Sequence, residues 1–390
     1  MFSVPDYYEF KCPVKLLSGL TALSSITFEM GLLGCETAMV VIDRASLGAG
    51  LLGPVNAAFS DSNRSIGHVF GEVGNEASLR IATRVADIFR QTRCDCFVAL
   101  GSGACMDTAK AANIMVSCED KALVDLQGRD KINDRLFPLI TIPISAEVNA
   151  ATTNTAAVYN EEKNKKMEFC SDSLYADVVA ISPAMVSAVS PRTMATQGLD
   201  CLTRALEAYT SAKKNPVVDI FASAAMDQVR GCLLRAVRDK HDKEARMGMV
   251  NAAFFAGIAS SSSGPGIIHA LARAVENTSH VPFTTANSIL LSKGIEYLVG
   301  DSMDNAEGIA GMMAGSVGHL EDKDAGKVPA DLVGALVTGL SEVSRLPGSL
   351  SVAGVKEDDL VEIAATAIRD YYTGDLKEVD ALDILKKALI

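Results

Sequence analysis

The sequence predicts a two-domain protein, with an α/β domain over residues 1–190 and an all-helical domain over residues 191–390. In the first part, short apolar runs alternate with helical stretches, a pattern typical of a parallel sheet covered by helices. In the second part, apolar residues recur at helical spacing and few segments resemble strands. A chain of 390 residues also exceeds what one hydrophobic core usually serves, which favours two domains.

The α/β part contains three expected strands and one expected helix. The strands are residues 38–42 (AMVVI), 96–100 (CFVAL) and 139–142 (LITI). Each is a short, continuous apolar run, as buried strands are. Residues 76–90, between the first two runs, carry apolar side chains at helical spacing. This region therefore predicts strand, helix and strand in succession.

The helical part begins at a proline. Pro191 opens a helical run that continues to Ser211, and two further runs follow at residues 216–237 and 242–262. Proline is favoured in the first turn of a helix, because the N–H group that it lacks would have no partner there. The change of pattern near residue 190 sets the predicted domain boundary.

Composition argues against several classes of function. The chain has a formal net charge of −12 and no block of Lys or Arg, so we expect neither nucleic acid nor an anionic membrane as a partner. No apolar stretch reaches the roughly eighteen residues that cross a membrane. The N-terminal residues MFSVPDYYEF do not resemble a signal peptide, so a cytoplasmic location is expected.

The nine cysteines are scattered among apolar runs, without the paired spacing of zinc ribbons. Cys94 and Cys96 are two residues apart and would point to the same side of a strand. Reduced thiols in the core are the expected state, because cysteine is among the most often buried residue types.

The most informative local pattern is the segment CFVALGSGACMDTAK at residues 96–110. An expected strand ends here, Gly101, Ser102 and Gly103 follow, and a helix begins. Glycines let the backbone approach a diphosphate, whose charge is met by free N–H groups and the positive end of the helix. A glycine-rich turn between strand and helix can also serve packing alone, so the pattern by itself leaves both interpretations open.

Asp43 directly follows the first expected strand. A carboxylate at this position can accept hydrogen bonds from an adenosine ribose, and it would repel a 2′-phosphate. This placement favours NAD over NADP. An ordinary aspartate in a turn after a strand is the alternative.

Two groups of polar residues lie on expected helices of the second part. Asp200 and Arg204 are four residues apart and share a helix face, where an ion pair stabilises a helix by only a few tenths of a kcal/mol. His269 follows a Gly-Pro-Gly turn, and Arg273 lies one helical turn later. A single histidine on a helix more often serves packing than catalysis, but the chain has only five histidines.

In their order, these segments resemble the iron-dependent alcohol dehydrogenases. GSGACMDTAK is similar to that family's GGGSxxDxxK turn, and residues 197–211 (QGLDCLTRALEAYTS) are similar to its GxDALTHAIEAY helix. Further similar segments are residues 143–158, HALARAVENTSHVPFTTANSILL (269–291) and LPGSLSVAGVKEDDL (346–360). The resemblance runs from about residue 35 to the end of the chain.

The resemblance implies the dehydroquinate synthase-like fold, in which a dinucleotide-binding α/β domain precedes a helical domain and the active site lies between them. It implies NAD as the cofactor. The residues that it assigns to cofactor binding are Asp43, Gly101, Ser102, Gly103, Asp107, Ser145 and Lys166. The matched segments depart from the family pattern at Ser102, Ala104 and Glu147-Val148, which replace a glycine, a serine and a Gly-Thr pair.

The largest departures fall on the metal ligands. The family holds its metal with one Asp and three His, which match Asp200, Arg204, His269 and Phe283 in this chain. Arginine stays protonated and cannot ligate, and two remaining ligands are too few for a zinc or iron site. His280, three residues before Phe283, could replace one ligand. We expect no catalytic metal, with Asp200 and His269 as residual ligand positions.

The resemblance therefore implies an NAD-dependent alcohol dehydrogenase or carbonyl reductase that acts on a small molecule. Arg204 and Arg273 are expected to stabilise the negative charge that hydride transfer leaves on oxygen, and Asp200 to orient Arg204. His269 is the expected proton donor, with a pKa near working pH.

Maleylacetate reductases, which belong to the wider family, work without metal on ketones that carry carboxylates. The two arginines are consistent with an anionic carbonyl substrate here too, and a homodimer is compatible with the resemblance. Two alternatives stay open at this stage. One is a non-catalytic homologue that binds cofactor or ligand, and the other is a lyase of the dehydroquinate synthase-like fold.

Overall fold

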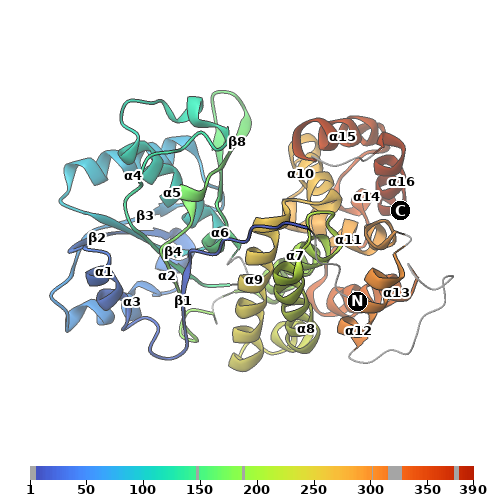
Figure 1. Cartoon of the computed structure of the whole chain (residues 1–390), viewed down its shortest axis with the longest axis horizontal. Coiled ribbons are helices and arrows are strands. Elements are labelled where there is room, and N and C mark those ends of the chain that lie inside the picture. The colour runs from blue at the N-terminus through green and yellow to red at the C-terminus, as the bar shows by residue number, and fades with distance from the viewer. Residues whose placement is uncertain (1–5, 146–148, 187–188, 301, 315–326, 373–376) are drawn as a thin grey trace. The chain divides into compact units, whose positions relative to one another are not determined.

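The computed structural model describes residues 6–145, 149–186, 189–300, 302–314, 327–372 and 377–390 (Figure 1). The chain divides into two units, one of residues 12–189 and one that begins at Ser190. Residues 6–11, which the sequence analysis grouped with the α/β domain, pack with the helical unit instead. The reason is an aromatic contact, because the ring of Phe10 stacks on Phe221 with centroids 5.8 Å apart.

A six-stranded sheet forms the centre of the first unit, and each of its strands runs parallel to its neighbours in the order β1-β9-β6-β4-β2-β3. The strands are β1 (Lys15–Ser18), β2 (Thr37–Asp43), β3 (Ser65–Val73), β4 (Cys96–Gly101), β6 (Leu139–Pro143) and β9 (Val178–Ile181). The three strands predicted from sequence are β2, β4 and β6, each one or two residues longer than expected.

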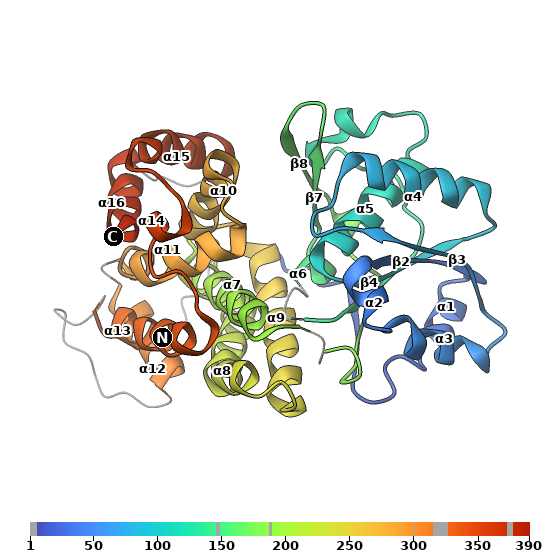
Figure 2. The same cartoon turned by 180° about the vertical axis from the view of Figure 1, so that it is seen from behind.

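Helices cover both faces of this sheet (Figures 1 and 2). Helices α1 (Ile26–Leu32) and α3 (Leu52–Ser60) pack on one face, and α4 (Leu79–Gln91) and α5 (Gly103–Ser117) cover the other. Because both faces are buried, the central strands are apolar throughout rather than alternating. The predicted helix at residues 76–90 is α4, which begins later because Ser78 caps it by accepting a hydrogen bond from the N–H of Ile81.

A second, three-stranded sheet belongs to the same unit. It pairs β7 (Thr155–Asn160) with β8 (Lys165–Cys170) in antiparallel fashion and adds the two-residue strand β5 (Gly128–Arg129). Two short helices, α2 (Arg44–Gly48) and α6 (Asn149–Thr152), follow β2 and β6 respectively. Buried side chains of this sheet pack against α4 and α5 in a core of their own.

The described residues of the second unit form helices and no strand. The helices are α7 (Pro191–Thr210), α8 (Pro216–Arg238), α9 (Lys243–Ser263), α10 (Ile267–Ser279), α11 (Phe283–Val299), α12 (Met303–Ala314), α13 (Lys327–Ser344), α14 (Leu350–Ala353), α15 (Leu360–Thr366) and α16 (Glu378–Leu389). The three predicted helices are α7, α8 and α9, with ends that differ by no more than one residue.

The start of α7 follows from local chemistry. The hydroxyl of Ser190 accepts a hydrogen bond from the N–H of Thr193, and Pro191 occupies the first helical position. Both features favour a helix that begins here. None of the helices in the described part of the chain combines the length and the apolarity that a membrane crossing requires.

Candidate active site

The turn between β4 and α5 has a backbone that only glycine can adopt at Gly101. Its φ angle is +146°, and a Cβ at this position would lie 2.1 Å from Oδ2 of Asp43. The next residue, Ser102, donates its backbone N–H to the same Oδ2 atom at 2.8 Å. The turn is therefore held against the end of β2, which is the neighbour of β4 in the sheet.

Asp43 is buried, with 4% of its surface exposed, and both of its carboxylate oxygens accept backbone hydrogen bonds. Oδ1 caps α2 by accepting from the N–H of Ser46 at 2.8 Å, and Oδ2 accepts from Ser102. Each oxygen has a second lone pair that can accept a further bond. Asp43 thus has a structural task beyond the ribose contact expected from sequence.

The residues at this edge of the sheet fit a dinucleotide. Gly101 removes the side chain that would block the backbone, and the fifteen-residue helix α5 starts directly after Ser102. Diphosphates bind where parallel strands end and a helix begins, at the positive end of the helix. The geometry matches the diphosphate interpretation of the sequence motif.

The other residues assigned to the cofactor lie in three places. Gly103 and Asp107 belong to the first turns of α5. Ser145 is buried and comes two residues after Pro143, which pairs with Gly101, so it lies near the same edge of the sheet. Lys166 is on β8 of the small sheet, and its Nζ pairs with Oε1 of Glu76 at 3.2 Å. Glu147 and Val148 lie outside the described residues.

Lys110 ends the glycine-rich segment at residues 96–110, and no role for it was predicted from the sequence. It is fully buried on α5, and its Nζ donates to the carbonyls of Thr153 and Thr155 at 2.7 and 2.9 Å. Burial lowers the pKa of Lys110 to about 8. The side chain ties α5 to the start of β7 and so positions the helix. Its place in the quoted motif was the available signal.

In the helical unit, α7 carries three acidic or basic side chains on one face, at Asp200, Arg204 and Glu207. Oδ2 of Asp200 accepts a hydrogen bond from Nε of Arg204 at 2.9 Å. Its Oδ1 accepts from Nδ2 of Asn287 on α11 at 3.0 Å. The ion pair that the spacing predicted is formed, and it links α7 to α11.

Arg204 keeps part of its guanidinium available. Its side chain is 17% exposed, and Nε is engaged by Asp200. Within the part of the chain that the structure describes, no residue accepts a hydrogen bond from Nη1 or Nη2. These two nitrogens can together bind an oxyanion or a carboxylate.

Two models of one protein family match this chain, one over each unit. The model described as "Iron-containing alcohol dehydrogenase" matches residues 13–183, and the one described as "Fe-containing alcohol dehydrogenase family, C-terminal" matches residues 194–388. This chain is a member of the iron-containing alcohol dehydrogenase family. It is therefore an oxidoreductase of alcohols and carbonyl compounds.

Individual relatives agree with this assignment. A probable alcohol dehydrogenase EutG of Salmonella typhimurium is 31% identical over 72% of this chain and 71% of its own length. An NAD-dependent methanol dehydrogenase of Bacillus methanolicus is 25% identical over 97% of this chain and 99% of its own length. The solved structure of an alcohol dehydrogenase from Oenococcus oeni is 23% identical, covers 98% of this chain and 100% of its own, and superposes with a TM-score of 0.91.

Phe283, which the sequence match aligns with the family's last metal-ligand position, contacts two of the predicted catalytic residues. Its ring lies against His269, with centroids 4.9 Å apart. On it rests the guanidinium of Arg273, with Cζ 4.2 Å from the ring centroid. Nη1 of Arg273 also pairs with Oε2 of Glu276 at 2.9 Å. The neighbours of Phe283 are therefore an imidazole and a paired guanidinium.

The predicted pKa of His269 was wrong. Burial, together with the nearby guanidinium groups of Arg204 and Arg273, holds the pKa of His269 well below its usual range. The imidazole is therefore neutral at neutral pH. It can donate a hydrogen bond, but it cannot act as a general acid in the way an imidazolium would.

Glu207 was missed by the sequence analysis. Its carboxylate accepts the backbone N–H groups of Gly266 at 3.1 Å and of His269 at 3.0 Å, and so caps the start of α10. A Cβ on Gly266 would lie 2.5 Å from Cδ of Glu207, so the contact requires glycine. Burial raises the pKa of Glu207 to about 7. Its spacing from Asp200 on one face of α7 was the signal that could have identified it.

The residues of this family member do not fit the family's catalytic metal. Oδ2 of Asp200 accepts a hydrogen bond from Nε of Arg204, a permanent cation that repels a metal cation at the same place. Among the described residues, no third His, Cys, Asp or Glu brings a ligand atom close to those of Asp200 and His269. The idea that His280 replaces a ligand was wrong. His280 is exposed at the far end of α10, about 16 Å along the helix from His269.

Proposed function

We propose that this family member interconverts a small alcohol and the corresponding aldehyde or ketone with NAD(H), and that Arg204 takes the place of the catalytic metal. One observation carries the proposal. Nε of Arg204 is fixed by Asp200, and its two terminal nitrogens have no acceptor among the described residues, at a position that the sequence match aligns with a family metal ligand. A fixed cation with available donors is what a developing oxyanion requires.

The choice of NAD rests on the first unit. The glycine turn at Gly101 fits a diphosphate, and Asp43 at the end of β2 would repel the 2′-phosphate of NADP. The methanol dehydrogenase relative, named as NAD-dependent, supports the same choice. When bound, the nicotinamide supplies or accepts the hydride.

In the proposed reduction, the carbonyl carbon gains a hydride and the oxygen gains a proton. Arg204 donates hydrogen bonds from Nη1 and Nη2 to the oxygen as its negative charge develops. Asp200 keeps the guanidinium in place through Nε, and Asn287 keeps Asp200 in place. His269, which is neutral, donates a hydrogen bond to the same oxygen, and the proton comes from solvent.

We propose an anionic group on the substrate. Arg204 and Arg273 both lower the pKa of His269, which means that both make the potential at the imidazole positive. Both arginines are paired with a carboxylate, but Asp200 engages only Nε of Arg204, whereas Glu276 engages the terminal Nη1 of Arg273, which also stacks on Phe283. A carboxylate or sulfonate near the carbonyl would be attracted to this potential.

NADH consumption by purified protein tests the proposal. A panel of matched aldehydes and keto acids, with and without a carboxylate, is assayed in the presence and absence of a strong chelator. We expect turnover that is unaffected by the chelator and faster with the anionic member of each pair. Loss of activity on chelation, restored by iron or zinc, would overturn the metal-free mechanism. Binding of NADH without turnover of any substrate would favour a non-catalytic homologue.

A further inference from the structure

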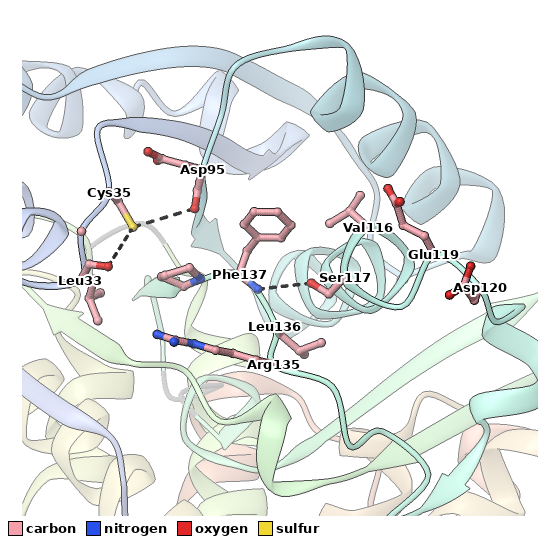
Figure 3. A pocket seen from close by; sticks show the side chains of 12 residues that line it. Leu33, Cys35, Asp95, Val116, Ser117, Glu119, Asp120, Arg135, Leu136 and Phe137 are labelled. Atoms are coloured by element: carbon pink, nitrogen blue, oxygen red, sulfur yellow. Dashed lines mark hydrogen bonds between the residues drawn. The ribbon is translucent and has the colours of Figure 1, made fainter.

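The edge of the large sheet opposite Gly101 contains a pocket (Figure 3). Its volume is about 700 Å³, and β4 begins beside it at Cys96. The pocket is lined by the residues before β2, the residues at the end of α5, and the segment that leads into β6. Cys35 and Asp95 line the pocket wall, and Arg135 extends along it.

Two metal-ligating residues, Cys35 and Asp95, line this pocket, and a third, Cys96, is buried next to them. The sulfur atoms of Cys35 and Cys96 and a carboxylate oxygen of Asp95 all lie within 4.8 Å of one another. In the described parts of the chain, no other set of three His, Cys, Asp or Glu side chains meets this distance. Both cysteines are buried, at 2% and 0% exposure, whereas Asp95 is only partly buried.

The surrounding backbone holds this arrangement in place. The carboxylate of Asp95 accepts hydrogen bonds from the backbone N–H of Glu36 at 2.7 Å and of Thr37 at 3.0 Å, one on each oxygen. Cys96 starts β4 and pairs with Ala38 of β2, three residues after Cys35. The two thiols and the carboxylate are thus fixed by sheet pairing and by second-shell hydrogen bonds, as ligands in metal sites usually are.

We propose that Cys35, Cys96 and Asp95 bind one thiophilic divalent cation of the zinc class, with water from the pocket as a fourth ligand. Zinc binds thiolate sulfur at about 2.3 Å and carboxylate oxygen at about 2.0–2.2 Å in a tetrahedron, so its ligands lie about 3.5–4 Å from one another. The three ligand atoms lie within 4.8 Å of one another, so a small movement of the side chains brings them to this separation. Both thiols release their protons on binding.

The charges near the site suit this ligand set. Two thiolates and one carboxylate with a divalent cation leave a net charge of about −1, and Arg135 lines the pocket that faces it. The site lies in the α/β unit and uses none of the residues assigned to catalysis.

The test is a titration of reduced, metal-depleted full-length protein with Cd²⁺ and with Zn²⁺. Ultraviolet charge-transfer absorption reports thiolate–Cd²⁺ bonds, and calorimetry reports the stoichiometry. We expect one equivalent to bind with both readouts. Cys35→Ser and Cys96→Ser should each weaken binding by about 100-fold or more, and Asp95→Asn by about tenfold. Cys94→Ser is the matched control, because Cys94 is also buried and lies two residues from Cys96 but outside the group.

Two further measurements keep the result decisive. Zn²⁺ should raise the Tm of the native protein but not that of Cys35→Ser, because only the folded native site binds it. Asp200→Asn should leave the titration unchanged, which separates this site from the helical unit and from the proposed catalytic mechanism. The proposal is overturned if native protein shows no charge-transfer absorption. It is also overturned if Cys35→Ser, shown to be folded by circular dichroism, binds as tightly as native protein.

Discussion

The turn at Gly101 belongs to the α/β unit, and the cluster of Asp200, Arg204, His269 and Phe283 belongs to the helical unit. The two sites have departed from the family pattern to different extents. At the turn, Ser102 and Ala104 replace family residues, yet the backbone still makes the strand-to-helix geometry of a diphosphate site. At the cluster, two substitutions replace the metal-ligand set by an ion pair and a stacked ring. A site built from backbone N–H groups tolerates side-chain changes that a metal site does not.

The physical difference lies in what each site needs. Diphosphate binding depends on one positive φ angle and on the direction of α5, which most side chains do not alter. A zinc or iron site depends on at least three ligand atoms at defined distances. Once Arg204 is present, its fixed charge repels a cation at the same place. Without a metal, only the arginine itself can stabilise the negative charge that develops on the substrate oxygen.

The largest expected effect comes from removing that charge. Arg204→Gln should lower kcat by about 10²–10³, or about 3–4 kcal/mol, which is typical for the loss of one preorganised donor to an oxyanion. NADH affinity should change little, because the glycine turn is untouched. Steady-state kinetics on a confirmed substrate and NADH fluorescence titration measure the two quantities.

Arg192→Gln is the control for this experiment, because Arg192 lies on the same helix but is exposed in its first turn. It should retain full kcat. Should Arg204→Gln also retain full kcat, Arg204 is only a structural partner of Asp200. Arg204→Ala is less informative, since it leaves the buried Asp200 carboxylate without its cation.

Rebuilding the family ligand set is the second way to test the comparison. Arg204→His combined with Phe283→His restores the Asp and three His of the family, and it should bind about one iron or zinc per chain at this place. The variant is made in a Cys35→Ser background, so that the pocket at the sheet edge does not contribute metal. Metal analysis after dialysis gives the stoichiometry.

The control adds Asp200→Asn to the double variant, which should abolish the gain. No gain of metal in a folded double variant would mean that the cluster cannot assemble the four ligands. In that case the packing of Phe283 against His269 and Arg273, rather than the two residue identities, excludes the metal.

The sequence predicted well those features that depend on neighbours in the chain. Strands β2, β4 and β6 are apolar runs buried on both faces and were predicted, and α7 was marked by Pro191, but the equally buried β9 was missed. Strand β3 went unpredicted because it is partly exposed and lacks a continuous apolar run. The short strand β1 has only four residues and leaves no clear pattern.

At the cluster, the Asp200–Arg204 pair followed from four-residue spacing, but its surroundings did not. Asn287 is 87 residues from Asp200, and Glu207 is 62 from His269, so these contacts exist only after α7, α10 and α11 pack together. The pKa of His269 depends on the same packing, because burial is its first cause. These contacts and the pKa of His269 depend on which residues become neighbours in the folded protein, and the sequence alone does not show those neighbours.

A smaller effect is expected from Glu207, which should make the free energy of unfolding depend on pH. Burial raises the pKa of Glu207 from 4.5 to about 7 in the folded protein. Between these two values the folded state holds a proton that the unfolded chain has lost, so the free energy of unfolding falls as pH rises. The slope is about 1.4 kcal/mol per pH unit, or roughly 3 kcal/mol over the window, and it ends near pH 7.

Glu207→Gln should remove this slope, because the amide does not titrate. Urea unfolding of native and variant protein at several pH values between about 4.5 and 8 measures it. Glu244→Gln is the control, since Glu244 is exposed and should leave the pH dependence unchanged. An identical slope in Glu207→Gln would show that other groups produce it.

The smallest expected effect concerns the preference for NADH over NADPH, which depends on the turn between β4 and α5. We expect the native protein to prefer NADH over NADPH, because the Asp43 carboxylate lies at the end of β2, where the ribose is expected to bind. Two unit charges about 4 Å apart in water repel each other by about 1 kcal/mol, which corresponds to roughly fivefold in affinity. Asp43→Gly and Asp43→Asn should both reduce the preference by about this factor, measured as the ratio of kcat/KM for the two cofactors.

Comparing the two variants also separates charge from structure. Asp43→Asn can keep the cap on Ser46 through its amide oxygen, whereas Asp43→Gly cannot. If only Asp43→Gly alters the ratio, the effect comes from loosening α2, because both variants lose the bond from the N–H of Ser102. Equal affinity of the native protein for NADH and NADPH would rule out the repulsion itself.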